Sequence, residues 1–261
     1  MTVSDRYGDV SVKIADDRVA TVTMHRPPDN YFDQTLIASI ADAYEALDAD
    51  DRCRAIVLCS EGKHFCAGAA LTRRDDGTVQ SGSGRHLYDE AVRLFRTAKP
   101  VVASIQGAAI GGGFGLAMST DFRVGTANAR MAANFARLGF HQGFGLSATL
   151  PLVVGHQKAL EILYTGRRLP GDECAAIGLL DRLVAPEDLD ATAHAFAADI
   201  AVSAPLAVVS IRQTMRGHLP DAIRAATDRE KAEQDRLRGT ADFAEGVRAT
   251  AERRPPNFEG R

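Results

Sequence analysis

The chain has 261 residues, of which 45% are hydrophobic and 25% charged, with 31 Lys and Arg against 34 Asp and Glu. This length allows one large domain with a buried core, and the composition excludes a disordered chain, a collagen-like chain and a coiled-coil rod. The formal net charge of −3 argues against a general nucleic-acid binder, which needs a basic face.

The four cysteines form no Cys-x-x-Cys pair, so they fit neither a zinc ribbon nor a thioredoxin-like motif, and we expect no metal site. Reduced thiols are typical of a cytoplasmic protein of this size. The opening residues, MTVSDRYGDV, contain no apolar signal region. We therefore expect a cytoplasmic location.

The first third of the chain predicts strands followed by a helix. Alternating apolar residues in Val10–Ile14 and Val19–Met24 predict a β-hairpin. Asp33 is a candidate cap for a helix whose apolar residues fall on one face. The apolar run 55–59 predicts a buried strand. The polar, glycine-rich stretch 71–84 predicts a mobile loop of the kind that often covers a ligand.

The stretch 100–120 carries no charge and is long enough to span a bilayer. It also contains five glycines and several polar residues, so its hydropathy is weak for a membrane span. We instead predict a buried strand over Val101–Ile105, a glycine turn and a helix from Gly112. No membrane partner is expected.

The rest of the chain is predicted to be mainly helical, with short strands between the helices. The predicted helices cover 86–98, 143–165 with interruptions at Pro151 and Gly155, 172–177 and most of the chain after 187. The predicted strands cover 122–125, a segment near Arg168 and 181–184. Asp121 and Arg123 are expected to pair. The charged, alanine-rich last fifty residues fit either helices packed against another subunit or a solvated helical tail.

Two glycine-rich segments follow buried strands and could carry chemistry. They read GKHFCAGAAL over 62–71 and QGAAIGGGFGLAM over 106–118. Small residues let a ligand approach the backbone, and the first N–H groups of a helix have no intrahelical acceptor. Two such groups aimed at one oxygen would form an oxyanion hole. Close packing of a strand on a helix is the structural alternative.

Other glycine motifs fail on spacing. A dinucleotide-binding GxGxxG would need glycine at Leu116, and the chain has neither a P-loop GxxxxGK[ST] nor a nucleophile-elbow GxSxG.

Together, these segments resemble the crotonase (enoyl-CoA hydratase/isomerase) superfamily over nearly the whole chain. The likeness rests on His25-Arg-Pro27, the FCAGA loop from Phe65, the three glycines from Gly111, LEILYTG from Leu160, AAIGL from Ala175, and the C-terminal EGVR, ERR and NF segments.

The resemblance implies an α/β fold, a spiral of strand-strand-helix (ββα) units. Residues 1–200 would form the acyl-CoA-binding core, and residues 201–261 a helical region that assembles trimers, often paired into hexamers. It also implies an acyl-CoA thioester as the substrate partner and no separate cofactor, because coenzyme A enters as part of the substrate. The shared chemistry is stabilisation of a thioester enolate by the backbone N–H groups of Ala69 and Gly112. The substrate-contacting residues that it implies are Arg26, Pro28, Ala67, Ala70, Leu71, Gly111, Asn134, Phe135, Leu138 and Gly143.

The chain departs from the hydratase pattern where proton transfer would occur. The two glutamates that hold water in hydratases fall on Gly115 and Phe135, and a third family position for a carboxylate falls on Gly143. Ala70 replaces an aspartate often found after the first loop. A positioned acid or base contributes about 10²–10⁴-fold to a rate. Because none of these positions carries an ionisable side chain, the chain lacks the ordinary hydratase machinery.

His141, two residues from Gly143, is the best candidate replacement, since histidine titrates near neutrality. The competing interpretation is a histidine that bonds the nearby backbone. Cys66 is a possible nucleophile, but no base is evident near it in the sequence, so we expect it to be structural. His64 is expected to shape its loop.

Two functions remain open on the sequence. The first is an enzyme that polarises an acyl-CoA thioester for hydration, isomerisation, decarboxylation or C–C bond cleavage. The second is a non-catalytic acyl-CoA binder. The missing glutamates favour the binder, and the intact glycine segments favour the enzyme.

Overall fold

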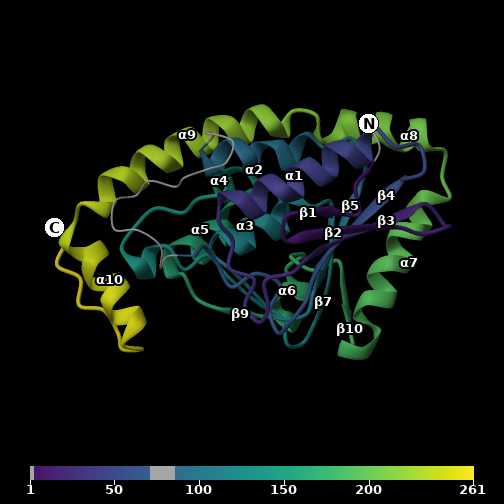
Figure 1. Cartoon of the computed structure of the whole chain (residues 1–261). Helices are drawn as coiled ribbons and strands as arrows, with labels where there is room; N and C mark the ends of the chain where they lie inside the picture. The colour runs from purple at the N-terminus through teal and green to yellow at the C-terminus, as the bar shows by residue number, and fades with distance from the viewer. Residues whose placement is uncertain (1–2, 71–85) are drawn as a thin grey trace.

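A computed structural model describes residues 3–70 and 86–261 (Figure 1). The predicted loop 71–84 and the candidate residue Leu71 lie outside this part of the chain. A seven-stranded sheet runs in the order β1-β2-β3-β4-β5-β7-β10, and a small sheet runs in the order β6-β8-β9.

The large sheet begins antiparallel and becomes parallel. Strands β1, β2 and β3 pair antiparallel, and every pair from β3 onward is parallel. Its strands are β1 (Arg6–Tyr7), β2 (Val10–Ile14), β3 (Val19–Met24), β4 (Ala55–Ser60), β5 (Val101–Ile105), β7 (Phe122–Thr126) and β10 (Arg182–Val184). The small sheet contains β6 (Ala108–Ile110), β8 (Arg130–Ala132) and β9 (Leu169–Pro170).

Ten α-helices are present in the described residues. They are α1 (Gln34–Asp48), α2 (Leu87–Arg96), α3 (Gly112–Ser119), α4 (Leu146–Val154), α5 (His156–Thr165), α6 (Gly171–Ala176), α7 (Leu189–Ala201), α8 (Pro205–Arg216), α9 (Leu219–Arg238) and α10 (Ala241–Ala251). Two 3₁₀ turns, Ala136–Leu138 and Pro186–Asp188, complete the set.

Helix α1 shows how the local sequence sets an element. The Asp33 carboxylate accepts a 2.9 Å hydrogen bond from Leu36 N, which satisfies one free donor at the helix start and confirms the predicted cap. Leu36, Ile37 and Ile40 are fully buried on the face that meets the sheet. Burying each such side chain contributes about 1.5–3 kcal/mol.

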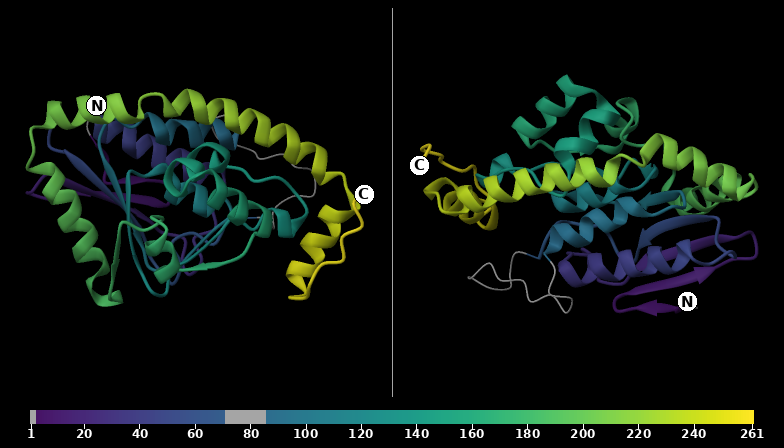
Figure 2. Two further views of the ribbon diagram at one scale, coloured as in Figure 1. Left: turned by 180° about the vertical axis from the view of Figure 1, so that it is seen from behind. Right: turned by 90° about the horizontal axis from the view of Figure 1, so that it is seen from above.

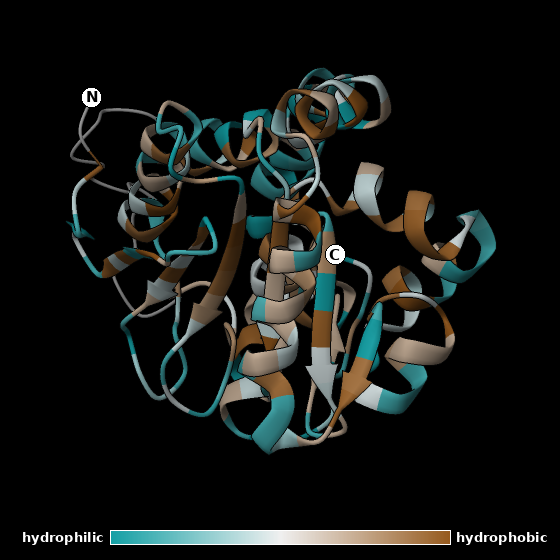
Figure 3. Ribbon diagram, turned by 90° about the vertical axis from the view of Figure 1, so that its right-hand side faces the viewer, coloured by the Kyte–Doolittle hydropathy of each residue, from teal (hydrophilic) through white to brown (hydrophobic). Residues whose placement is uncertain are grey.

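The sheet has helices on both faces because its side chains alternate. In β4, Ile56 and Leu58 join the large core beneath α1, whereas Ala55 and Val57 belong to a second cluster covered by α7. Figure 3 shows the result as brown hydrophobic stretches along the strands, surrounded by helices that carry both colours.

The C-terminal helices wrap around this core. Helix α9 lies over α2, and α7 and α10 stand at opposite ends of the molecule (Figures 1 and 2). The expected boundary at residue 200 falls at the end of α7, and α8 to α10 follow it. None of the described helices is alone long and apolar enough to cross a membrane, although Pro186–Ala201 and Pro205–Arg238, bent by 103°, pass together on length and composition.

The expected pairing of Asp121 with Arg123 is wrong. Arg123 pairs with Asp181, which accepts from its backbone N at 2.8 Å, and Asp121 pairs with Arg212 and Arg216 of α8. The three arginines reach these carboxylates from two elements, β7 and α8, that lie far apart in the chain, and sequence proximity alone does not reveal such pairs.

Candidate active site

The FCAGA loop is held between two neighbouring segments of backbone. On one side, Cys66 N donates to Ala108 O at 2.9 Å and Ile110 N donates to Cys66 O at 3.0 Å. On the other side, Phe32 N donates to Gly68 O at 3.0 Å and Ala70 N donates to Phe32 O at 2.9 Å. The loop therefore continues a parallel ladder from both edges.

The register of this ladder puts Ala69 and Gly112 at matching positions, each three residues past a paired residue. Cys66 pairs in parallel with Ala109, and three residues further along both segments are Ala69 and Gly112. Neighbouring segments of a ladder lie about 4.7–4.9 Å apart. Within residues 3–70 and 86–261, neither of these two N–H groups has an acceptor. Both residues are half-buried, Ala69 between buried Gly68 and exposed Ala70 and Gly112 between two buried glycines, so a ligand oxygen can reach them.

Glycine is required here because the backbones approach closely. A Cβ on Gly113 would lie 2.2 Å from Cys66 O, and Gly111 has a φ of +56°, which disfavours other residues. A Cβ on Gly112 would lie 2.3 Å from Phe32 Cζ. The glycine run therefore serves both the helix start and the packing that brings the two segments together.

Asn30, which the sequence analysis did not single out, organises the loop from below. It is fully buried, and its amide Nδ2 donates to Glu61 O at 2.6 Å and His64 O at 2.7 Å, while its Oδ1 accepts from Arg26 N. The Pro28 carbonyl accepts from Lys63 N and His64 N. The local sequence signal for this role is an asparagine two residues after the pair Pro27-Pro28.

Aromatic rings occupy the space around α3 where the sequence analysis looked for carboxylates. A Cβ on Gly115 would lie 2.5 Å from the Cβ of Phe144, and the Phe135 ring lies 3.7 Å from where a Gly111 Cβ would be. Phe144 and Phe32 are nearly fully buried and pack edge to face, with ring centroids 5.6 Å apart. The surroundings of Gly112 are therefore apolar.

A polar clamp holds the Phe144 loop in place. Tyr88 Oη donates to Gln234 Oε1 at 2.8 Å, and Gln234 Nε2 donates to the His141 and Gln142 carbonyls. Burial raises the pKa of Tyr88, which keeps its hydroxyl protonated and able to donate. Phe144 adopts φ +61°, a left-handed conformation that is uncommon for a phenylalanine.

Buried Glu230 adds the second half of this clamp. Its carboxylate accepts from Gly145 N at 2.8 Å and Ser147 N at 3.0 Å, at the start of α4. A carboxylate is favourable at a helix N-terminus because of the helix dipole. The clamp residues lie on α2 and α9, far from the loop in sequence, so no local pattern reveals them.

His141 bonds the backbone in this structure. Its Nδ1 lies 2.8 Å from Gln142 O, in agreement with the competing interpretation, and no described contact joins its ring to Ala69 or Gly112. Gly143 faces Tyr88 and Gln234 instead, because a Cβ there would lie 2.2 Å from Tyr88 Oη.

The remaining candidate substrate contacts are spread around the site. Asn134 and Phe135 lie beside Gly111, with Asn134 Oδ1 3.3 Å from where its Cβ would be, whereas Leu138 packs its backbone on Gly246 of α10. Ala67 N donates to Asp29 O, and Ala70 is exposed.

Arg26 is already occupied by carboxylates. Its Nε donates to Asp9 at 2.7 Å, and its Nη1 lies 2.9 Å from Asp33. Although burial opposes the charged form, these hydrogen bonds raise the pKa of Arg26.

Cys66 is a poor nucleophile. It is fully buried, and burial raises the pKa of its thiol to about 12, so the reactive thiolate is absent near neutral pH. His64 Nδ1 accepts from Ala108 N at 3.1 Å and so shapes the loop as expected. No group of three His, Cys, Asp or Glu side chains among the described residues could hold a metal ion.

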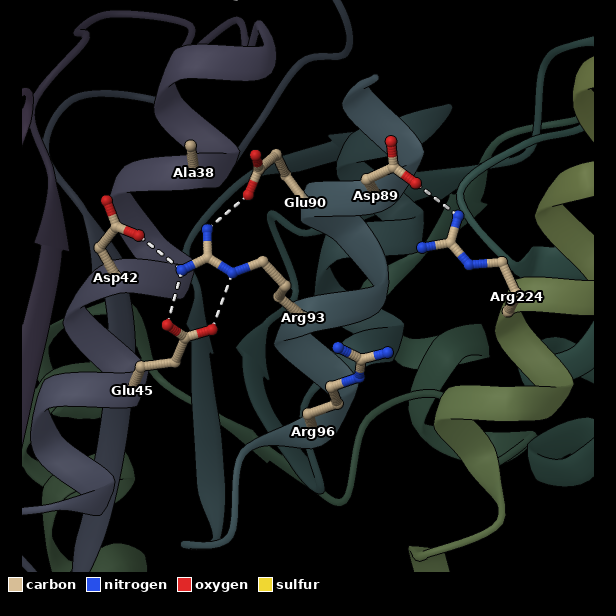
Figure 4. A pocket seen from close by; sticks show the side chains of 8 residues that line it. All are labelled: Ala38, Asp42, Glu45, Asp89, Glu90, Arg93, Arg96 and Arg224. Atoms are coloured by element: carbon tan, nitrogen blue, oxygen red, sulfur yellow. Dashed lines mark hydrogen bonds and ion pairs between the residues drawn. The ribbon is translucent and has the colours of Figure 1, made fainter. Parts of the chain in front are cut away.

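A cavity of about 680 Å³ between α1, α2 and α9 is not the acyl site (Figure 4). Arg93 there binds Asp42, Glu45 and Glu90, and Arg224 binds Asp89 at 2.6 Å. Ion pairs already occupy most of these side chains, and no residue of either glycine segment lines the cavity.

The chain is similar to known proteins over almost its full length. A sequence model of the enoyl-CoA hydratase/isomerase family matches residues 15–261. A short-chain-enoyl-CoA hydratase of Clostridium acetobutylicum is 30% identical over 241 residues, covering 91% of this chain and 92% of that protein. A 1,2-epoxyphenylacetyl-CoA isomerase of Escherichia coli is 29% identical over 250 residues, covering 93% and 95%.

The fold gives the same result. The crystal structure of an enoyl-CoA hydratase/isomerase from Pseudoalteromonas atlantica matches with a TM-score of 0.87 at 28% identity, covering 96% of this chain and 100% of that one. This confirms the predicted crotonase-like α/β fold with its helical C-terminal region. The chain belongs to the enoyl-CoA hydratase/isomerase family of the crotonase superfamily.

Proposed function

We propose that the protein is an enzyme that binds an acyl-CoA thioester and stabilises its enolate through the N–H groups of Ala69 and Gly112. The observation that supports this proposal is the register of the FCAGA loop. Ala69 and Gly112 each follow the Cys66–Ala109 pair by three residues, and neither N–H has an acceptor among the described residues. Donors fixed in this way stabilise charge that develops on the thioester oxygen. Loss of one such donor typically costs about 2.7–4 kcal/mol of barrier.

The apolar surroundings of Gly112 favour a reaction other than simple hydration. Gly115 and Phe135 carry no titratable side chain, and Phe144 fills the space in front of Gly115. Decarboxylation generates an enolate without a protein base, and isomerisation or C–C bond cleavage could use a single proton carrier. His141 is the proposed carrier, reaching the acyl group after a rotation that breaks its bond to Gln142 O.

We further propose a homo-trimer, alone or paired into a hexamer, in the cytoplasm. Support comes from large apolar side chains that α8 exposes, namely Leu206 at 84%, Met215 at 68% and Ile211 at 63%. Exposed apolar faces of this kind mark protein interfaces.

The test is exchange of the thioester α-hydrogen in heavy water, followed by mass spectrometry of a panel of acyl-CoAs. Gly112→Pro removes the donor N–H, whereas Gly112→Ala keeps it and adds the same Cβ beside Phe32. We expect exchange by the wild type, a loss of at least about 10²-fold in Gly112→Pro, and a clearly smaller loss in Gly112→Ala.

Equal losses in the two variants would contradict the role of the Gly112 N–H. Tight binding of an acyl-CoA without any exchange would instead identify a non-catalytic binder. Rapid hydration of crotonyl-CoA, measured as the loss of its conjugated absorbance, would show that another group activates water.

A further inference from the structure

A second polar cavity lies at the end of α3 away from Gly112. It has a volume of about 260 Å³, several times the roughly 30 Å³ that one water occupies in the liquid. Its wall contains three arginines and, among the described residues, no carboxylate. It is lined by Phe95, Arg96, Thr97, Arg212, Gln213, Arg216, Gly217 and Pro220. We call it the Arg212 cavity.

One carboxylate behind the wall partly balances this charge. Both oxygens of Asp121 lie 3.1 Å from Arg212 Nε, and one lies 3.0 Å from Arg216 Nε. The side chains of Arg212 and Asp121 are only 9% and 8% exposed. Arg96 forms no ion pair with the described residues, and Figure 4 draws it without an interaction to the residues around it. The three arginines and Asp121 therefore sum to a charge of +2.

Two of the buried polar groups in this wall lack a partner. Arg212 uses Nε for Asp121 and Nη1 for Thr97 O, which leaves Nη2 without an acceptor. The hydroxyl of Thr97, a residue only 3% exposed, has no partner either. Buried polar groups are nearly always hydrogen-bonded, so two orphans on one cavity point to a missing acceptor.

Neighbouring charges do not supply that acceptor. Asp48 faces Arg212 but accepts from Ala98 N at 2.8 Å and Lys99 N at 3.1 Å. Arg216 Nη2 donates to Ser119 O, the last residue of α3. The cavity therefore stands one helix length, about 12 Å, from the proposed oxyanion donors.

We propose that the Arg212 cavity binds a phosphate-type oxyanion. A phosphate group carries between about −1.5 and −2 charges at pH 7, which matches the charge of the wall. Its tetrahedral oxygens can accept from Arg212 Nη2, Thr97 Oγ1 and Arg96 at once, and guanidinium groups pair with phosphate through parallel N–H bonds. Arg212 Nη2 and Thr97 Oγ1 are themselves buried, so binding requires the wall to open enough to expose these two donors.

The test is calorimetric titration of the full-length protein with sodium phosphate at constant ionic strength, with acetate and adenosine monophosphate titrated in parallel. We expect one saturable phosphate site. Arg96→Ala and Thr97→Val should each raise its dissociation constant at least tenfold. Arg52→Ala, an exposed arginine paired with Asp50, is the control and should leave the constant unchanged.

Arg212→Ala is avoided because it would remove one of the two arginines that pair with buried Asp121 and so destabilise the protein. Tighter binding of adenosine monophosphate than of phosphate would assign the site to a phosphate ester, and the reverse to the free anion. The proposal fails if phosphate binding is not saturable, if acetate binds as well, or if the variants bind like the wild type, which would mean an adventitious ion only.

Discussion

At the scale of single residues, Gly115 and Phe144 form one unit. The Cβ that any other residue would place at 115 falls 2.5 Å from Phe144 Cβ, an atom fixed by the backbone rather than by a flexible side-chain end. Phe144 is 1% exposed and holds φ +61°. A carboxylate therefore cannot be introduced at 115 without changing 144.

This unit predicts a strong coupling between two substitutions. Gly115→Glu alone should lower the free energy of unfolding by about 1–3 kcal/mol through overpacking. The loss should persist in a Phe144→Ala background, which keeps the colliding Cβ, and shrink in a Phe144→Gly background, which removes it. Urea unfolding of the six proteins measures this coupling, and equal losses in both backgrounds would contradict the collision.

The sequence predicted part of this site and missed the rest for a physical reason. The non-ionisable residues at Gly115 and Phe135 are read from the sequence itself, and the donors proposed at Ala69 and Gly112 rest on motifs within a few residues. The ring that fills the gap is placed by Tyr88 and Gln234, 56 and 90 residues from Phe144 in the chain. Such tertiary clamps leave no periodic or local pattern.

At the scale of elements, α2 begins with an unusual cap. The His86 imidazole accepts at Nδ1 from Tyr88 N at 3.1 Å, and the Asp89 carboxylate accepts from His86 N at 3.0 Å. Only a neutral imidazole nitrogen can accept. Burial lowers the pKa of His86, and the charge of Lys231 lowers it further, against the opposing pull of Asp89.

The sign of the pH dependence follows from this lowered pKa. The cap's stabilisation is fully present above the ordinary histidine pKa of about 6.5 and is lost as pH falls through the folded-state pKa. We expect the free energy of unfolding to fall between about pH 7 and 5. His86→Asn, which caps without titrating, should flatten that slope, and His86→Ala should cost about 0.5–2 kcal/mol at pH 7.5.

Unfolding in urea across this pH range checks the prediction. His156→Asn is the matched control, because His156 begins α5 without a side-chain cap bond. A wild-type slope that His86→Asn leaves intact would assign the titration to another group.

Element prediction from the sequence succeeded where a pattern was long enough. The five-residue strands, α1 and the glycine start of α3 were predicted, whereas β1, β6 and β8 were not. These missed strands have only two or three residues, too few to show alternation, although the equally short β9 and β10 were predicted near Arg168 and over 181–184.

At the scale of the whole molecule, one carboxylate ties the C-terminus to the fold. Glu245 in α10 accepts from Arg254, from Arg248 and, at 3.0 Å, from Asn257 N. The hydrogen bond from the Arg254 guanidinium is the main cause that holds the pKa of Glu245 well below its usual range. Glu245 therefore holds the tail as far as Asn257, and Asp242 holds its end by accepting from Glu259 N and Gly260 N.

Because the folded-state pKa is lowered, this anchoring is present above the ordinary glutamate pKa of about 4.3 and is lost as pH falls toward the folded value. Glu245→Gln should release the tail at pH 7, seen as faster amide hydrogen exchange over 252–261 in mass spectrometry. Glu252→Gln is the control and should change exchange little. The wild-type Glu252 carboxylate is 52% exposed and pairs with Arg254 but not with Arg248 or Asn257 N. Unchanged protection in Glu245→Gln would contradict the anchor.

The order of strands in the large sheet has a consequence for how the chain assembles. Strands β1 to β5 each pair with the strand made just before them, so this half of the sheet can grow as the chain leaves the ribosome. The last strand, β10, pairs with β7 across more than fifty residues, and α9 packs on α2 from still further along the chain. Closing such long loops is slow. The loop clamp on Phe144 draws on α9, so the finished surroundings of Gly112 form only after nearly the entire protein has been synthesised.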